Sequence, residues 1–247
     1  MSHQSFAEAI REDDSVPYAL RDLLKGATAS VPDLTVEGIN SDSRAIRAGE
    51  AFFALPGTRV HGDGFAAQAV SQGAIAMVTD RAPDAAPGVP VVVVEDVRAA
   101  YARAAALQFA PQPQVMVGVT GTNGKSSIVS FVRQIWAASG IEAASLGTVG
   151  VETGAGIRPR ELTTSDSLSL HRDLGELKAV GIDHVAMEVS SQGLDQRRAD
   201  GIRFNAVAFS NLSRDHLDYH ADMDEYREAK LRLFKDLIAE GGAAVVN

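Results

Sequence analysis

The sequence predicts an α/β protein of two domains: a small N-terminal α/β domain, followed by a domain built on a doubly wound, mostly parallel sheet. Pro111 and Pro113 lie one residue apart and interrupt helix and strand alike, so they indicate a boundary between domains at 1–111 and 112–247. Short apolar strands alternate with helical patterns before this boundary. After it the strands are continuous apolar runs, which are typical of a parallel sheet covered on both faces.

The predicted elements follow in regular alternation along the chain. Strands are apolar runs bounded by Gly, Pro, Asn or Asp, and helices repeat apolar residues at helical spacing. In the first domain we expect strands at 35–42, 51–57, 74–80 and 89–96, with helices at 64–73 and 97–110. In the second we expect strands at 114–121, 184–191, 203–211 and 241–247, with helices at 126–140 and 223–238.

Two predicted helices have a definite apolar face. The faces consist of Ile128, Phe131, Val132 and Ile135 in the first helix, and of Met223, Tyr226, Leu233 and Leu237 in the second.

The last predicted strand, at 241–247, has the apolar pattern of a buried strand, and no helix follows it in the sequence. Because a parallel sheet needs a crossover before its next strand, we expect the sequence to end inside an incomplete domain.

Composition excludes several classes of function. The formal net charge of −9 argues against broad nucleic-acid binding, which needs an electropositive surface. The absence of cysteine excludes disulfides, thiolate metal sites and a cysteine nucleophile. The charged N-terminus is unlike a secretory signal, and no apolar run approaches the length of about 20 residues that spans a bilayer. We therefore expect a cytoplasmic protein with neither a membrane nor a nucleic acid as partner.

The stretch VGVTGTNGKSS, residues 117–127, lies between a predicted strand and a predicted helix. This is the context of a phosphate-binding loop, in which glycines let N–H groups approach phosphate oxygens and the helix dipole favours anions. A turn with a chance lysine is the alternative. A lysine adds mobile positive charge, and a neighbouring hydroxyl suits Mg²⁺. The residues predicted to bind ATP are Gly121, Thr122, Asn123, Gly124, Lys125, Ser126 and Ser127.

Three further residues have charge or metal-ligand chemistry. Glu188 ends an apolar strand, where an unpaired buried carboxylate is costly, so we expect it to meet a cation at the carboxyl edge of the sheet. His216 lies in a polar turn after a strand, and Lys230 lies on a predicted helix. Taken alone, the histidine suits a hydrogen-bonded structural role and the lysine suits a solvated helix surface.

The sequence resembles the Mur ligase family. The glycine loop, GTVG at Gly147, LTTSDSL at Leu162 and nearly all of 186–234 match the central domain of these enzymes. INSDSR, AFFALPG and HGDGF match their first domain, in the same order. The resemblance covers essentially the whole sequence, and it is to the members that add the third amino acid of the peptidoglycan precursor.

The resemblance implies an ATP-dependent amide ligase that uses Mg²⁺. It implies that Lys230 is carbamylated, and that a phosphoryl group passes from ATP to the D-Glu side chain of UDP-N-acetylmuramoyl-L-Ala-D-Glu before the third amino acid, diaminopimelate or lysine, attacks. The implied catalytic residues are Lys125, Glu188, His216 and Lys230, and the implied metal ligands are Ser126, Glu188, His216 and Lys230. The implied substrate contacts are Ser41, Ser43, Thr58, Arg59 and Val60 for the uridine moiety, and Thr163, Thr164, Ser190, Gln196 and Arg198 for the muramoyl dipeptide.

Other interpretations remain open. Any single serine or threonine in this set can be a helix cap instead. A folylpolyglutamate synthetase shares the loop and the modified lysine but has no uridine-binding first domain. A kinase or GTPase is disfavoured because the first glycine of the pattern G-x-x-x-x-G-K-(S/T) would fall at Val119, whereas the glycine of this sequence is one residue earlier, at Gly118. The family's third, C-terminal domain, which selects the amino acid, is expected to be missing. We therefore expect the chain alone to be nearly inactive, and a non-catalytic nucleotide-binding or assembly module is a further alternative.

Overall fold

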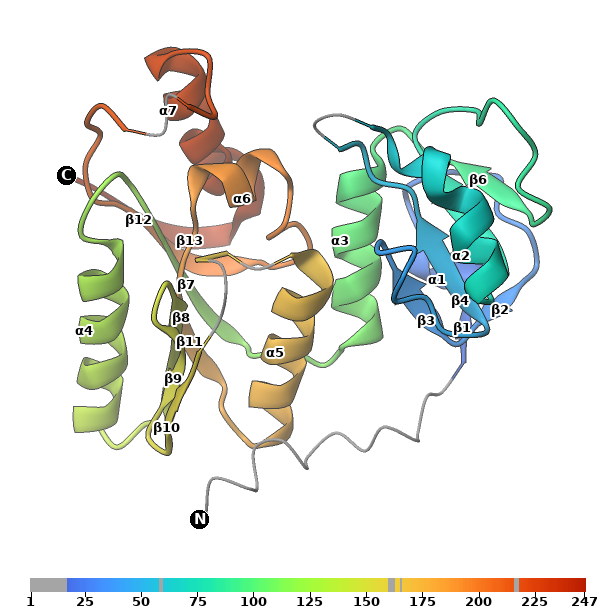
Figure 1. Ribbon diagram of the computed structural model, residues 1–247. Coiled ribbons are helices and arrows are strands. Elements are labelled where there is room, and N and C mark those ends of the chain that lie inside the picture. The colour runs from blue at the N-terminus through green and yellow to red at the C-terminus, as the bar shows by residue number, and fades with distance from the viewer. Residues whose placement is uncertain (1–16, 58–59, 160–162, 165, 216–217) are drawn as a thin grey trace. The chain divides into compact units, whose positions relative to one another are not determined.

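The computed structural model describes residues 17–57, 60–159, 163–164, 166–215 and 218–247 (Figure 1). The described chain divides into two compact units, 17–108 and Phe109–Asn247. Each unit has its own parallel sheet, so the predicted fold class is confirmed. Within the described ranges, no helix combines the length and the apolar character needed to cross a membrane.

The N-terminal unit is built on a four-stranded parallel sheet of order β3-β4-β5-β6. Alternate residues of β4 face opposite ways: Phe52 packs with Ala69 of α2, whereas the ring of Phe53 lies 5.1 Å from that of Tyr101 of α3. A separate antiparallel pair is formed by β1 and β2. The elements are β1 (Tyr18–Ala19), α1 (Leu20–Leu23), β2 (Thr35–Val36), β3 (Gly38–Asn40), β4 (Glu50–Phe53), the 3₁₀ turn η1 (Gly62–Phe65), α2 (Ala66–Gln72), β5 (Ala76–Thr79), β6 (Val91–Val93) and α3 (Val97–Gln108).

The second unit has a seven-stranded sheet of order β10-β9-β8-β11-β7-β12-β13. The five strands from β8 to β13 in this order are parallel, and the hairpin β9–β10 adds antiparallel strands at one edge. The elements are β7 (Val115–Thr120), α4 (Lys125–Ala138), β8 (Ala143–Gly147), β9 (Gly150–Thr153), β10 (Gly156–Arg158), α5 (Ser167–Ala179), β11 (His184–Glu188), α6 (Ser191–Asp195), β12 (Phe204–Phe209), α7 (Met223–Arg232), a π-helical turn η2 (Leu233–Leu237) and β13 (Ile238–Val246).

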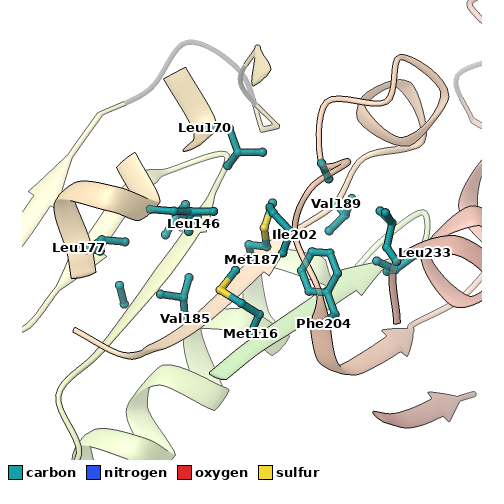
Figure 2. Close-up of a cluster of buried hydrophobic side chains, with 14 of the residues drawn as sticks. Met116, Leu146, Leu170, Leu177, Val185, Met187, Val189, Ile202, Phe204 and Leu233 are labelled. Carbon is teal, nitrogen blue, oxygen red and sulfur yellow. The ribbon is translucent and has the colours of Figure 1, made fainter. Parts of the chain in front are cut away.

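Helices cover both faces of this sheet, as a doubly wound fold requires. Figure 1 shows α4 and α5 on opposite sides of the strands. Val119 and Ala186 pack with Val129 of α4. The alternate residues of the same strands face the larger cluster of Figure 2, in which Met116 and Met187 lie with Leu170, Leu177 and Leu233. This two-sided burial explains the continuous apolar character of the central strands.

Two sequence predictions for this unit are wrong in part. On α4, Phe131 and Ile135 are 61% and 64% exposed, because the helix turns the side that carries Val129 toward the sheet. The final strand exists but is not buried: β13 lies at the sheet edge, with Val245 and Val246 mostly exposed. The helix expected at 223–238 is confirmed: α7 continues directly into η2, and the helical segment reaches Leu237. The hairpin β9–β10 was not predicted.

Candidate functional site

A four-residue loop, 121–124, joins the central strand β7 to α4 at the carboxyl edge of the sheet. Gly121 and Gly124 have φ angles of +135° and +85°, which residues with a side chain rarely adopt. A Cβ on Gly121 would also lie 2.0 Å from Ser210 Oγ. No side chain caps α4 at Gly124, so the first N–H groups of this 14-residue helix are available to an anion.

Lys125, the first residue of α4, bends back over the loop. Its Nζ donates to the carbonyl oxygens of Gly121 at 2.9 Å and of Thr122 at 2.8 Å. Burial lowers the pKa of this ammonium, whereas the charges of Glu188 and Asp215 raise it. The lysine is thus partly desolvated and held directly above the loop that it is predicted to serve.

Lys230 approaches the same loop from α7. Its side chain is 1% exposed, and its Nζ donates to the carbonyl of Gly121 at 2.9 Å and lies 4.3 Å from the ring centre of Tyr226. Burial, with a further contribution from the charge of Lys125, lowers the pKa of Lys230 to about 7. The alternative of a solvated helical lysine is therefore wrong. Two amines from distant parts of the chain converge on one carbonyl oxygen.

Glu188 ends β11, the parallel neighbour of β7, and is 2% exposed, as expected. Its Oε1 accepts a hydrogen bond of 2.9 Å from the N–H of Thr148. Gly147 makes this position possible, because a Cβ there would lie only 1.9 Å from the same oxygen. The negative charge of Glu188 acts on Lys125, whose pKa it raises, so the carboxylate and the loop form one electrostatic unit.

Ser126 and Ser127 are exposed on the first turn of α4, next to the loop. His216 lies outside the described residues. Among the residues that the structure does describe, no group of three or more His, Cys, Asp or Glu is arranged to hold a metal. Of the predicted metal ligands, the structure describes two oxygen donors at this edge, Ser126 and Glu188.

The residues predicted to hold the muramoyl dipeptide form one hydrogen-bonded group beside β11. The buried Thr164 hydroxyl donates to Glu188 O at 3.3 Å and accepts from Ser190 N at 3.0 Å. Arg198 donates to Thr164 O at 2.8 Å and to Gln196 Oε1 at 2.6 Å. Ser190 caps α6 through Gly193 N, so its hydroxyl has the structural role that the helix-cap alternative describes. Thr163 joins the group through the Thr148 hydroxyl at 2.9 Å.

The residues predicted to meet uridine lie in the N-terminal unit. Ser41 and Ser43 follow β3, and residues 54–57 follow the neighbouring β4, so both lie at the carboxyl edge of one sheet. The Ser43 hydroxyl is buried and donates to Gln68 Oε1 at 2.8 Å, whereas Val60 is 57% exposed. Thr58 and Arg59 lie outside the described residues.

Several residues at this edge were not singled out from the sequence. A cavity of about 440 Å³ beside the loop is lined by residues that include Ser127, Phe209, Asn211 and Asn247. Ser210 and Asn211 directly follow the apolar strand β12, and Glu188 is the last residue of β11, so their similar position at the strand ends was the available signal. Tyr226 was counted only as part of an apolar helix face.

A parallel sheet whose central strand passes through a glycine loop into a helix that begins with lysine defines the class of phosphate-loop proteins. Residues 119–247 match the Mur ligase middle domain, and residues 35–109 match the Mur ligase family, catalytic domain. The chain belongs to the Mur ligase family.

Curated relatives are named UDP-N-acetylmuramoyl-L-alanyl-D-glutamate–2,6-diaminopimelate ligase. The one from Brucella melitensis is 49% identical over 221 residues, which are 89% of this chain and 45% of that protein. The one from Bradyrhizobium diazoefficiens is 46% identical over 231 residues, which are 92% of this chain and 47% of that protein. The chain thus spans about half the length of the curated relatives it matches.

Solved structures agree on the fold. A structure of UDP-N-acetylmuramoyl-L-alanyl-D-glutamate–2,6-diaminopimelate ligase matches with a TM-score of 0.79 and 29% identity, over 94% of this chain and 47% of that one. The MurF ligase from Thermotoga maritima in complex with ADP matches with a TM-score of 0.57 and 20% identity, over 84% of this chain and 45% of that one. The second match bears on the fold alone.

Proposed function

We propose that this chain carries the substrate-binding and ATP-binding domains of an amide ligase of peptidoglycan precursor synthesis, working in the cytoplasm. Residues 1–111 bind the uridine end of UDP-N-acetylmuramoyl-L-Ala-D-Glu, and residues 112–247 bind ATP. One observation carries the proposal: the glycine loop, Lys125, Glu188 and Lys230 converge at one edge of a doubly wound sheet. The names of the relatives favour diaminopimelate as the third amino acid.

In the proposed reaction the free side-chain carboxylate of D-Glu attacks the terminal phosphorus of ATP, and ADP leaves. The amine of the third amino acid then attacks the carbonyl carbon of this acyl phosphate, an amide bond forms, and inorganic phosphate and a proton are released. The chain contributes positioning and electrostatics: first-turn N–H groups of α4 hold phosphate oxygens, and Lys125 neutralises charge on the transferring group. No side chain has to act as a covalent nucleophile.

Two of the residues predicted to bind the metal, Ser126 and Glu188, offer oxygen ligands, which Mg²⁺ prefers. Ser126 offers an exposed hydroxyl after β7, and Glu188 offers a buried carboxylate at the end of the adjacent strand β11. With His216 and a modified Lys230, these residues would hold the metal, which supplies positive charge at phosphate oxygens when bound. A carboxylate buried to this degree is costly without such a partner.

We also propose that Lys230 is carbamylated. Its neutral amine attacks the carbon of CO₂, an N–C bond forms and a proton is released, which turns a cation into an anionic oxygen donor. A pKa of about 7 leaves a large share of this amine neutral at neutral pH. Native mass spectrometry in bicarbonate buffer should show the added mass of one CO₂, lost on mild acid treatment.

Two variants separate Lys230 from other lysines. Lys230→Arg should show no added mass, whereas Lys235→Arg should keep it, because Lys235 is an exposed lysine that pairs with Glu228. An unmodified Lys230 in an active enzyme would refute the modification.

The proposed function is tested by calorimetric titration of the chain with UDP-N-acetylmuramoyl-L-Ala-D-Glu and with Mg-ADP, using dihydropteroate as the control ligand. We expect the first two to bind and the third not to bind. Binding of dihydropteroate without the muramoyl nucleotide would instead favour a folylpolyglutamate synthetase-like ligase. Binding of Mg-ADP alone would favour a nucleotide-binding module without a substrate site.

A further inference from the structure

A second segment, residues 210–213, lies along the glycine loop; we call it the clamp segment. It directly follows β12, which pairs in parallel with β7, so both chains leave the sheet at the same edge. Ser210 N donates to Thr120 O at 3.0 Å, and Ser213 N donates to the Thr122 hydroxyl at 3.0 Å. The clamp segment therefore contacts the chain just before the loop and at the loop's second residue.

Asn211 makes the central contacts of the clamp segment. Its backbone carbonyl accepts from Thr122 N at 2.8 Å. Its side-chain amide pairs with both backbone groups of Asn123: Oδ1 accepts from the N–H at 3.0 Å, and Nδ2 donates to the carbonyl at 3.0 Å. The Ser210 hydroxyl donates to the same Asn123 carbonyl at 2.6 Å. A single loop residue, Asn123, is thus held by three hydrogen bonds through its two backbone groups.

These bonds distinguish two sets of N–H groups, one in the loop and one in the first turn of α4. The N–H groups of Thr122 and Asn123 are used by Asn211, so they shape the loop instead of facing a ligand. The N–H groups of the first turn of α4 have no side-chain cap at Gly124 and are left to receive phosphate oxygens. A loop ordered in this way before binding loses less conformational entropy when a phosphate arrives.

We propose that Asn211 is a positioning residue of the nucleotide site, which holds the backbone N–H and carbonyl of Asn123 and so sets the loop in its phosphate-binding shape. The inference rests on the proposed function, since it takes the loop to be the ATP phosphate site. Asn211 acts through the loop, and its contribution requires no contact with the nucleotide.

The test compares Asn211→Ala with Asn205→Ala. Asn205 lies near the other end of β12, where its Oδ1 accepts from Met116 N at 2.7 Å, so this control also removes one asparagine that binds the neighbouring chain's backbone. Calorimetric titration with Mg-ADP should show about a ten-fold loss of affinity for Asn211→Ala, the size expected for one or two net hydrogen bonds. Asn205→Ala should bind like the parent chain.

Hydrogen exchange on the nucleotide-free proteins provides a second readout. The Asn123 N–H should be protected in the parent and in Asn205→Ala, and should exchange rapidly in Asn211→Ala. The Thr122 N–H bonds to the backbone carbonyl of residue 211, so it should stay protected in all three proteins. Protection of the β7 amides in all three proteins checks that they are folded. If Asn211→Ala does not fold, Ser210→Ala, which removes another bond to Asn123, should weaken Mg-ADP binding a few-fold.

The outcomes separate the two proposals. Equal Mg-ADP affinity for the parent and for Asn211→Ala would overturn the role of Asn211 and leave the nucleotide site in place. A protected Asn123 amide in Asn211→Ala would also overturn it, because the loop would then be ordered without the Asn211 side chain. A parent chain that binds no Mg-ADP would overturn the proposed nucleotide site itself.

Discussion

Substitution of Gly147 by alanine should disable the site at Glu188 and leave the fold intact. Gly147 ends β8, whose extended backbone alanine adopts without strain. The added Cβ would lie 1.9 Å from Glu188 Oε1, 2.6 Å from its Cδ and 2.8 Å from its Cγ, whereas real contacts of this kind are not shorter than 3.0 Å. The carboxylate must therefore retreat by about 1 Å (3.0 − 1.9), and its 2.9 Å bond from Thr148 N is lost.

Displacements of this size have large consequences where groups bind a metal or a phosphate. Loss of a residue that orients a metal ligand typically costs about 10- to 100-fold in metal affinity or activity. We therefore expect Gly147→Ala to bind Mg-ADP about 10- to 100-fold more weakly than the parent chain in calorimetric titration, with little change in the affinity for ADP measured without Mg²⁺.

Gly154→Ala is the matched control, since it lies in the turn between β9 and β10 and its Cβ would meet nothing within 4 Å. This variant should bind both forms of ADP like the parent. Equal Mg-ADP affinity for Gly147→Ala and Gly154→Ala would refute the reasoning, because Glu188 would then not serve the metal-bound nucleotide.

Two further predictions concern stability. His171 is fully buried; its Nε2–H donates to Asp200 O at 3.0 Å, and burial lowers its pKa from 6.5 to about 4. The unfolded chain thus takes up a proton below pH 6.5 that the folded chain refuses until about pH 4. The free energy of unfolding should fall by about 2 kcal/mol from this residue between pH 7.5 and pH 5 in urea titrations. His171→Gln should lose less, and an equal loss would contradict this assignment. On α4, Phe131→Ser and Ile135→Ser should each change the free energy of unfolding by less than about 0.5 kcal/mol, whereas Val129→Ala should cost about 1–3 kcal/mol. Equal costs in the same urea titrations would contradict the observed orientation of the helix.

The fold and the phosphate loop could be predicted because their signals are local. A continuous apolar run, two glycines and a helix that begins with lysine lie within 25 or so residues, and each has a direct physical reason. Glu188 could be predicted for the same reason, since a carboxylate at the end of an apolar strand reaches the functional edge of the sheet.

The environment of Lys230 could not be predicted, because it depends on which face of α7 packs against a loop 109 residues earlier in the chain. Its neighbours on that helix are mostly charged, so local sequence favours a solvated position. The error at Phe131 and Ile135 has a related cause: apolar residues on two adjoining sides of α4 compete for the sheet, and Val129 occupies the contact. The exposure of β13 depends on its place at the edge, which strand periodicity alone does not give.

The position of Lys125 has a consequence for how tightly the loop can bind. Its ammonium group makes two hydrogen bonds with carbonyl oxygens of the loop itself. An ammonium group has three N–H donors, so these two bonds leave one N–H for a phosphate oxygen and fix its direction. A phosphate then meets a lysine that the protein has already oriented, and less side-chain entropy of Lys125 is lost on binding. The strength of nucleotide binding therefore depends on the shape of the loop backbone as well as on the groups that touch the nucleotide.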